Sequence, residues 1–405
     1  MKKPKYPEQV AEVIGQLESA GYAAYIVGGA LRDALLGREA HDFDVTTSAL
    51  PGDMVRIFSD YPVIETGLKH GTLTVLVDHC PIEITTFRID GEYRDARHPD
   101  GVTFTDRVED DLARRDFTVN AMAYNERRGL VDAFGGCEDL AAGVIRAVGD
   151  PVARFSEDAL RILRAFRFLS KLDFAIEPET LAATRTCRGG LAQISAERIT
   201  AELCGLFEGC AAGKALLAMI ENDIFSAFAP DFKIDRGAVD GVELLPPVFE
   251  TRLAYFLRGC TDGGECLIRQ LRLSNASRSR VRSLLELRKF RFLPLAEARI
   301  RRFLAAAGVY ADDAEALIRV GDFFDLSEDQ SDRLLSGMEA ARARGVCLTV
   351  ASLAVDGRAL MALGIQGRAV GETLNALLDR VLENPSLNKK DTLLAMAEEF
   401  KNGKL

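Results

Sequence analysis

The sequence predicts an α+β protein in which a mixed strand–helix region is followed by an all-helical remainder. Strand patterns fall almost entirely within the first 150 residues. After Pro151 the apolar residues keep a helical period to the end of the chain. A glycine turn and two aspartates one residue apart lie within residues 24–51. At 405 residues the chain is too long for one core, so we expect two to four domains.

The first region alternates between predicted helices and strands. Apolar residues at helical spacing predict helices, and short apolar or alternating runs predict strands. Helices are expected at residues 8–20, 30–37 and 50–61, and strands at 23–29, 41–49, 71–78 and 80–89. The polar segment 91–107 carries both signs of charge, which predicts a mobile functional loop.

Composition is that of an ordinary globular protein, with 48% hydrophobic and 28% charged residues. No apolar run approaches the ~18 residues of a membrane helix, and the first residues do not have the pattern of a signal peptide. We therefore expect a cytoplasmic protein without a membrane partner. Its eight cysteines form no C-x-x-C pair, which predicts reduced thiols and neither a zinc nor a redox site.

Charge is unevenly distributed along this acidic chain, whose net charge is -10. The segment from Arg269 to Arg302 has eleven Lys or Arg residues and two acidic ones. Such a basic segment fits the footprint of a nucleic-acid backbone, and it fits a set of solvated helix faces equally well.

Two aspartates of the stretch HDFDVTT suggest a metal site. If this stretch is a strand, Asp42 and Asp44 project from one face while Phe43 points into the core. Nearby carboxylates repel each other unless a cation bridges them, and Mg²⁺ prefers oxygen ligands shared with substrate phosphates. Glu83 on a neighbouring predicted strand is a candidate third carboxylate, so two-metal nucleotidyl transfer is one chemistry that fits.

The glycine turn suggests an anion site. A strand that ends at Gly28-Gly29 and opens a helix presents free backbone N–H groups and the positive helix end to a phosphate. Arg32 lies one turn into that helix. The pattern is neither a P-loop nor a dinucleotide-binding motif, and a plain strand-to-helix turn with a surface arginine is the alternative.

Motifs in this order make the family recognisable: GGALRD, HDFDVTT, LKHGTLTV, EITTFR, LARRDFTVNAMAY, RFSEDALRILRAFRF and ISAERI. Together they resemble the class II tRNA nucleotidyltransferases, the CCA-adding enzymes, and the related bacterial poly(A) polymerases of the DNA polymerase β-like group. These motifs cover residues 24 to about 200. The stretch 353–388 resembles the C-terminal region of Firmicutes-type CCA-adding enzymes.

The resemblance implies a polymerase β-like nucleotidyltransferase head followed by an all-α neck, body and tRNA-binding tail, at residues 1–150, 151–210, 211–300 and 301–405. It implies Mg²⁺-dependent addition of C, C and A to the 3′ end of tRNA from CTP and ATP, without a nucleic-acid template. By the same resemblance, the catalytic carboxylates are Asp42, Asp44 and Glu83, with the metal on Asp42 and Asp44. The implied nucleotide-binding residues are Gly29, Arg32, Arg115, Asp158, Arg161, Arg164 and Arg167, with Asp116 and Asn120 beside Arg115.

If the stretch EDALR is helical, two of its side chains could select which base is bound. Asp158 and Arg161 would then lie on one helix face, where an intrahelical salt bridge is the simpler interpretation. As a base-reading pair, the carboxylate accepts from the exocyclic amine of cytosine or adenine, and the guanidinium donates to the adjacent ring nitrogen. Uracil and guanine present the opposite pattern, which costs on the order of 1–3 kcal/mol per mismatched group.

Three alternatives to full CCA addition stay open at this point: a poly(A) polymerase, a partial enzyme that adds only CC or only A, and an inactive head kept as an RNA-binding module. The intact carboxylates argue against the inactive module. All four histidines precede residue 100, so the His-Asp phosphohydrolase region of some relatives is not expected.

Overall fold

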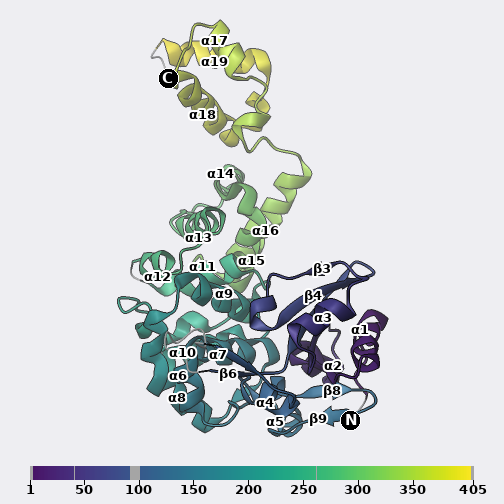
Figure 1. Cartoon of the computed structure of the whole chain (residues 1–405). Helices are drawn as coiled ribbons and strands as arrows, with labels where there is room; N and C mark the ends of the chain where they lie inside the picture. Colours follow the sequence, from purple (N-terminus) through teal and green to yellow (C-terminus); the bar gives the residue numbers. More distant parts are fainter. Residues whose placement is uncertain (1–2, 41, 92–100, 261, 403–405) are drawn as a thin grey trace. The chain divides into compact units, whose positions relative to one another are not determined.

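The structure is a computed structural model that describes residues 3–40, 42–91, 101–260 and 262–402 (Figure 1). Its contacts divide the chain into two compact units, residues 1–232 with 270–272, and residues 233–269 with 273–405. A mixed sheet lies in the first unit and helices fill the remainder, so the predicted fold class is confirmed. The division into head, neck, body and tail is finer than these units and stays a prediction.

A seven-stranded sheet forms the centre of the first unit, with the strand order β3-β4-β5-β2-β1-β8-β9. Strands β2 and β5 pair in parallel, whereas the other neighbours run antiparallel. Burial alternates along β4 because every second side chain faces the core. The strands are β1 (Ala24–Val27), β2 (Asp44–Thr47), β3 (Val63–Ile64), β4 (Thr72–Val77), β5 (Cys80–Thr86), β8 (Ala123–Asn125) and β9 (Gly129–Val131).

Two small sheets accompany the central one. The first pairs β6 (Arg88–Asp90) with β7 (Val102–Phe104), and the second pairs β10 (Val144–Ile145) with β11 (Ala175–Ile176). The predicted loop 91–107 therefore ends in a strand. Residues 92–100 of that loop lie outside the described residues.

Helices of the first unit pack beside the sheet and on one another, with α7 against α9 and α10, and α6 against α8. Labels and colours in Figure 1 locate them from purple to teal. They are α1 (Glu8–Ser19), α2 (Gly28–Leu35), α3 (Pro51–Ile57), α4 (Val108–Ala113), α5 (Gly136–Ala142), α6 (Pro151–Glu157), α7 (Leu160–Leu172), α8 (Pro178–Cys187), α9 (Ala196–Phe207) and α10 (Ala212–Glu221).

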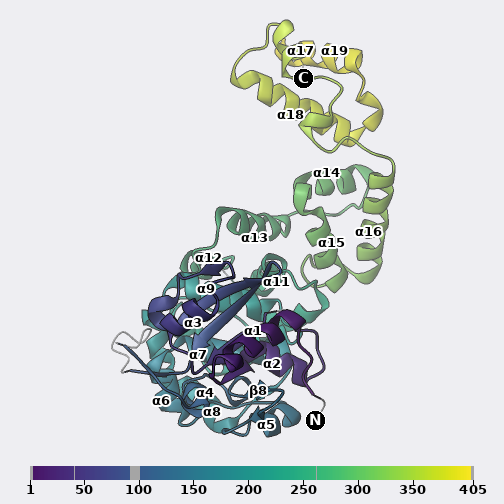
Figure 2. The same cartoon turned by 45° about the vertical axis from the view of Figure 1, so that its right-hand side comes forward.

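Helices α14, α15 and α16 of the second unit pack side by side, which Figure 2 shows in green. Rings of Phe290, Phe292, Phe303 and Phe324 pack edge-on or tilted in this region. The main helices are α11 (Phe249–Phe256), α12 (Glu265–Gln270), α13 (Asn275–Leu287), α14 (Glu297–Ala307), α15 (Ala311–Val320), α16 (Glu328–Ala343), α17 (Gly357–Ala362), α18 (Arg368–Glu383) and α19 (Lys390–Lys401).

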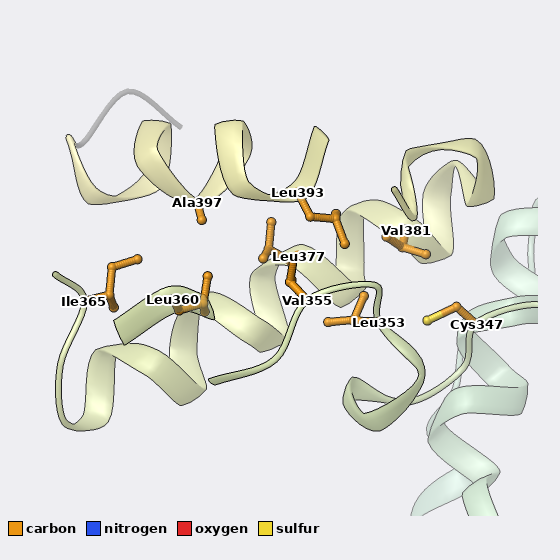
Figure 3. Close-up of a cluster of buried hydrophobic side chains, with 9 residues drawn as sticks. All are labelled: Cys347, Leu353, Val355, Leu360, Ile365, Leu377, Val381, Leu393 and Ala397. Atoms are coloured by element: carbon orange, nitrogen blue, oxygen red, sulfur yellow. The ribbon is translucent and has the colours of Figure 1, made fainter. Parts of the chain in front are cut away.

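The last helices share a hydrophobic core of their own (Figure 3). Leu360 of α17, Leu377 of α18 and Leu393 of α19 are fully buried in it. The apolar spacing of this C-terminal segment is therefore explained by packing. None of the described helices is both long and apolar enough to cross a membrane.

Candidate active site

A cavity of about 570 Å³ lies in the first unit and collects most of the predicted site residues. It brings together the start of α2, the paired strands β2 and β5, the segment after α4, and helices α7 and α9. Of the predicted residues, those that line it are Gly29, Arg32, Asp44, Glu83, Arg115, Asp158, Arg161, Arg164 and Arg167, together with Asp116 and Asn120. Asp42 does not line this cavity.

Positive charge dominates the cavity wall although the chain as a whole is acidic. Its acidic lining residues are Asp44, Glu83, Asp116 and Asp158, whereas the basic ones are Arg32, Arg88, Arg114, Arg115, Arg161, Arg164, Arg167, Lys171 and Arg198. A concave surface with this excess of guanidinium groups is complementary in charge to a polyphosphate.

The glycine turn places backbone directly beside charged side chains. Gly28 has a φ of 74°, a region that L side chains rarely adopt. A Cβ added at Gly28 would lie 3.4 Å from Nη1 of Arg115 and 3.6 Å from Oδ2 of Asp44. No side chain caps the first turn of α2, so its N–H groups remain free to bind an anion.

Asp44 and Glu83 meet across neighbouring strands, although the predicted strand 41–49 is longer than the observed β2 at both ends. Strand β2 begins at Asp44, so Asp42 precedes it, but exposed Asp42 and Asp44 still flank buried Phe43 with the alternation that was predicted. Phe43 is buried as expected. The parallel register places Asp44 directly opposite Glu83 of β5, and both side chains remain accessible.

Burial and neighbouring carboxylates raise the pKa of Asp44. Burial is the largest cause of its raised pKa of about 6, even though part of the side chain stays accessible to solvent. Repulsion from Glu83 and from Asp42 raises the pKa further, while Arg115 opposes the rise. The three carboxylates are thus close enough to repel one another, and a bound cation would relieve that repulsion.

Within the described ranges, no group of three or more His, Cys, Asp or Glu side chains is arranged to hold a metal ion. Mg²⁺ takes several of its oxygen ligands from water and from substrate phosphates rather than from protein side chains.

A buried hydrogen-bond network links α2 to α7. Arg32 is almost fully buried, and its Nη1 donates to Oδ1 of Asn120 at 2.7 Å. Nδ2 of Asn120 donates to Asp116 at 3.2 Å, and Nε of Arg164 donates to Asp116 at 2.7 Å. Burial would raise the pKa of Asp116, but these donors and the charge of Arg164 outweigh it and lower the pKa to about 2.

The fully buried carboxylate of Asp111 lies beside Arg115. Asp111 binds Arg114 through two hydrogen bonds of 2.9 and 2.7 Å and lies 3.5 Å from Nη2 of Arg115. Nε of Arg115 is buried without a hydrogen-bond partner among the described residues. A buried donor of this kind is available to a ligand in the cavity.

The predicted helix over EDALR is broken. Helix α6 ends at Glu157, and Asp158 is extended with φ −141° and ψ 104° before α7 begins at Leu160. Asp158 and Arg161 are therefore not neighbours on one helix face. They do not form the alternative salt bridge either, because each binds other partners.

Those other partners fix both side chains at the cavity. Asp158 accepts from the N–H of Leu160 at 3.0 Å and from Nη2 of Arg198 at 2.8 Å. Arg161 donates to Glu157 at 2.5 Å and to the backbone carbonyl of Arg114 at 3.1 Å. Both still line the same cavity, so a base could meet an acceptor and a donor there.

Phe168 and Arg198 are among the cavity residues that were not predicted from the sequence. The ring of Phe168 lies 4.8 to 5.6 Å from the guanidinium carbons of Arg32, Arg164 and Arg167. A phenylalanine in an apolar helix pattern gives no sequence signal for such a role. Arg198 did carry a signal, because it belongs to the ISAERI motif, but the motif alone does not identify its partner.

Much of the basic segment Arg269–Arg302 is occupied by internal contacts, so it is not a free basic stripe. Arg280 pairs with Asp313 at 2.6 Å, Arg282 with Glu265 at 2.7 Å, and buried Arg301 donates to the carbonyl of Leu382. A groove of about 750 Å³ on α13 is lined by Arg278, Arg282 and Lys289 and by acidic Glu286. Within it Lys289 pairs with Glu286, and Arg282 keeps its pairing with Glu265.

Comparisons with known proteins agree with the site. A family profile described as "Poly A polymerase head domain" matches residues 24–146, and one described as "Probable RNA and SrmB- binding site of polymerase A" matches residues 173–235. The CCA-adding enzyme of Lactobacillus helveticus is 34% identical over 419 aligned positions, which cover 99% of this chain and 100% of that protein. The chain belongs to the CCA-adding enzyme family.

Other members align over a shorter part of the chain at higher identity. The Geobacillus stearothermophilus CCA-adding enzyme is 46% identical over 228 positions, which are 56% of this chain and 55% of that protein. A solved CCA-adding enzyme of Bacillus stearothermophilus in complex with CTP superposes with a TM-score of 0.80 at 31% identity, over 100% of this chain and 99% of that one.

A more distant structure, the Thermotoga maritima CCA-adding enzyme complexed with tRNA, is 21% identical with a TM-score of 0.69, and it covers 98% of this chain and 96% of that one. At this identity it supports the fold alone. The family to which the chain belongs works with a divalent metal, which agrees with the crowded carboxylates at β2 and β5.

Proposed function

We propose that this chain adds C, C and A to the 3′ end of tRNA from CTP and ATP, without a nucleic-acid template. One observation carries the proposal: a single cavity holds the carboxylates of β2 and β5 beside the arginine-rich face of α7. A nucleoside triphosphate has a polyanionic end and a base end, and this cavity offers matching chemistry to both.

The polyphosphate end is assigned to the glycine turn and to two arginines. Free N–H groups at the start of α2 and the positive end of that helix attract phosphate oxygens. The buried Nε of Arg115 lies beside this turn and has no hydrogen-bond partner in the part of the chain that the structure describes. Gly28 has no side chain to separate the backbone from Arg115. Arg32 adds positive charge and is locked by Asn120 and Asp33.

Asp42 and Asp44 are proposed to hold Mg²⁺, with Glu83 as the third catalytic carboxylate. When bound, the metal would lower the pKa of the attacking hydroxyl and neutralise the leaving pyrophosphate. The chain's own contribution is to hold Asp44 and Glu83 opposite each other in the fixed register of β2 and β5. The position of Asp44 next to Arg115 keeps the carboxylates close to the polyphosphate end.

The base end is assigned to Asp158 and Arg161, with Arg164 and Arg167 beside them. Asp158 offers an acceptor for the amine of cytosine or adenine, and Arg161 still has N–H groups that no described residue uses. The two groups come from a kink and a helix rather than from one helix face. The complementarity to C and A is nevertheless unchanged, because it depends on acceptor and donor reaching one base edge.

RNA is also proposed to contact the second unit. The groove on α13 with Arg278, Arg282 and Lys289 can contact a phosphate backbone without reading sequence. We further propose that residues 1–150 form the head, 151–210 the neck, 211–300 the body and 301–405 the tail. We also propose a cytoplasmic location, since tRNA is the proposed substrate.

Incubation with a tRNA that lacks its 3′ CCA tests the proposal against each alternative. With Mg²⁺, we expect CTP alone to add two nucleotides and CTP with ATP to add three. Long adenylate tails would identify a poly(A) polymerase. Extension that stops after CC, or that requires a CC end, would identify a partial enzyme, and no extension at all would leave an RNA-binding module.

A further inference from the structure

Helix α9 places two charged side chains against residues of the base end of the cavity. Arg198 and Glu202 are four residues apart and therefore lie on the same face of the helix. That face packs on α7. Each of the two side chains contacts residues assigned above to nucleotide recognition, and neither was predicted to have a role.

Arg198 holds the acceptor of the proposed base-reading pair. Asp158 is extended between α6 and α7, so no helix fixes its carboxylate. Its Oδ1 is held locally by the N–H of Leu160, whereas its Oδ2 accepts from Nη2 of Arg198 at 2.8 Å. Each oxygen keeps a further acceptor site, so the carboxylate is fixed but still available to a base.

Glu202 holds the arginines on the other side. Its Oε2 lies 2.6 Å from Nε of Arg167, and its Oε1 lies 3.8 Å from Nη1 of Arg164. The 2.6 Å contact is not aligned as a hydrogen bond, so we regard it as an ion pair. The two guanidinium groups repel each other and share the ring of Phe168, so a fixed negative charge is needed to keep them together.

We propose that Arg198 and Glu202 are positioning residues: Arg198 sets nucleotide choice through Asp158, and Glu202 sets nucleotide affinity through Arg167. This inference rests on the proposed function. Its physical basis is that a side chain must be held in one direction to reject the wrong base, since a free carboxylate can turn away from a mismatched carbonyl.

The test for Arg198 is a double-mutant cycle read as nucleotide choice. Catalytic efficiency is measured for CTP, ATP, UTP and GTP in Arg198→Ala, Asp158→Ala and the double variant. We expect Arg198→Ala to lower the CTP-to-UTP ratio roughly tenfold or more. In the Asp158→Ala background the same change should alter that ratio by less than about twofold, because Arg198 acts through Asp158.

Glu202→Gln tests the second half with a different readout. Loss of the charge that orders Arg167 should raise KM for CTP and ATP by a similar factor of roughly ten, with the CTP-to-UTP ratio unchanged. In an Arg167→Ala background, Glu202→Gln should have little further effect on KM. Independent losses in both backgrounds would overturn this half of the proposal.

Glu197→Ala is the matched control. Glu197 lies on the same helix, but its exposed side chain pairs with exposed Arg272 at 3.3 Å, away from the cavity lining. We expect it to leave both nucleotide choice and KM unchanged. If Arg198→Ala fails to fold, Arg198→Lys keeps the test decisive, because a shorter reach to Asp158 should still lower the ratio, by less than alanine would.

Additive losses in the Arg198 double variant, or an unchanged CTP-to-UTP ratio in a folded Arg198 variant, would overturn the assignment. Failure of the proposed function is distinguishable from either result. In that case the unmodified chain itself would not complete a tRNA that lacks CCA.

Discussion

Arg164 of α7 donates from Nε to Oδ2 of Asp116 at 2.7 Å, and this contact joins the base end of the cavity to its phosphate end. Asp116 also accepts from Asn120, which in turn accepts from Arg32 of α2. One buried carboxylate therefore sets the distance between the helix that follows the glycine turn and the helix proposed to recognise the base.

Asp116→Asn is expected to destabilise the protein by on the order of 2 kcal/mol near neutral pH. The pKa of Asp116 is lowered to about 2 in the folded state, so its ionised form stabilises the fold. The ionised carboxylate therefore contributes its full stabilisation above the ordinary pKa near 3.8, and this stabilisation is lost as the pH falls toward 2. Denaturant unfolding at pH 7, 5, 4 and 3 should show the difference from the unmodified chain shrinking only below about pH 4.

Asp173→Asn is a suitable comparison for that experiment. Asp173 is exposed and pairs with exposed Lys214 at 2.8 Å. Surface pairs contribute roughly 0–1 kcal/mol, so this variant should change stability little at any of these pH values. Equal destabilisation by the two variants would mean that the network around Asp116 has no special importance.

Asp44→Asn is expected to abolish nucleotide addition and the stabilisation of the protein by Mg²⁺. The carboxylates near Asp44 repel one another in the free protein, so a cation that binds there should raise the unfolding temperature. Thermal unfolding with and without MgCl₂ measures this directly, independently of activity. The same rise in both proteins would place the metal elsewhere, and normal turnover of Asp42→Ala or Asp44→Asn would remove their catalytic assignment.

Gly28→Ala is expected to lose nucleotide binding beyond its cost in stability. Gly28 and Gly37 both have φ near 70°, at 74° and 71°, so alanine at either position should cost about 1 kcal/mol of stability. Only at Gly28 would the added Cβ meet Arg115 and Asp44, since nothing lies within 4 Å at Gly37. Titration with CTP should therefore show weaker binding for Gly28→Ala alone. Comparable affinity in the two variants would separate the glycine turn from the phosphate site.

Asp158→Ala and Arg161→Ala are expected to change nucleotide choice in different ways. Loss of Asp158 removes both the acceptor for the amines of C and A and the group that repels a carbonyl, so discrimination against UTP and GTP should fall. Loss of Arg161 should cost activity for CTP and ATP alike, about 1–3 kcal/mol or at least tenfold in kcat/KM. Measuring kcat/KM of both variants for CTP, ATP, UTP and GTP tests this prediction. A lower unfolding temperature with unchanged selectivity would mean that both residues are only structural.

Local chemistry was the predictable part of this site. The glycine turn, the two-aspartate stretch and the strand with Glu83 each follow from short-range patterns, and the structure places them on adjacent strands. The kink at Asp158 was not predictable, because EDALR has good helix formers on both sides and the carboxylate is held by Arg198, forty positions away. Long-range partners of this kind leave no mark in local spacing.

The basic segment Arg269–Arg302 is a second case in which long-range partners could not be predicted from the sequence. Charge counting identified it, but counting cannot tell that Arg280 and Arg301 are used by Asp313 and by the carbonyl of Leu382. Phe168 is a further example, because an aromatic residue at helical spacing looks the same whether it fills a core or supports three guanidinium groups.

The most direct test of the central claim is to sequence the 3′ ends of a tRNA lacking CCA after incubation with the unmodified chain, Mg²⁺ and all four nucleoside triphosphates. Template-independent choice by one cavity predicts products that end in CCA and stop there, with UTP and GTP excluded although present. Ends with uridine or guanosine, or adenylate tails of variable length, would contradict it.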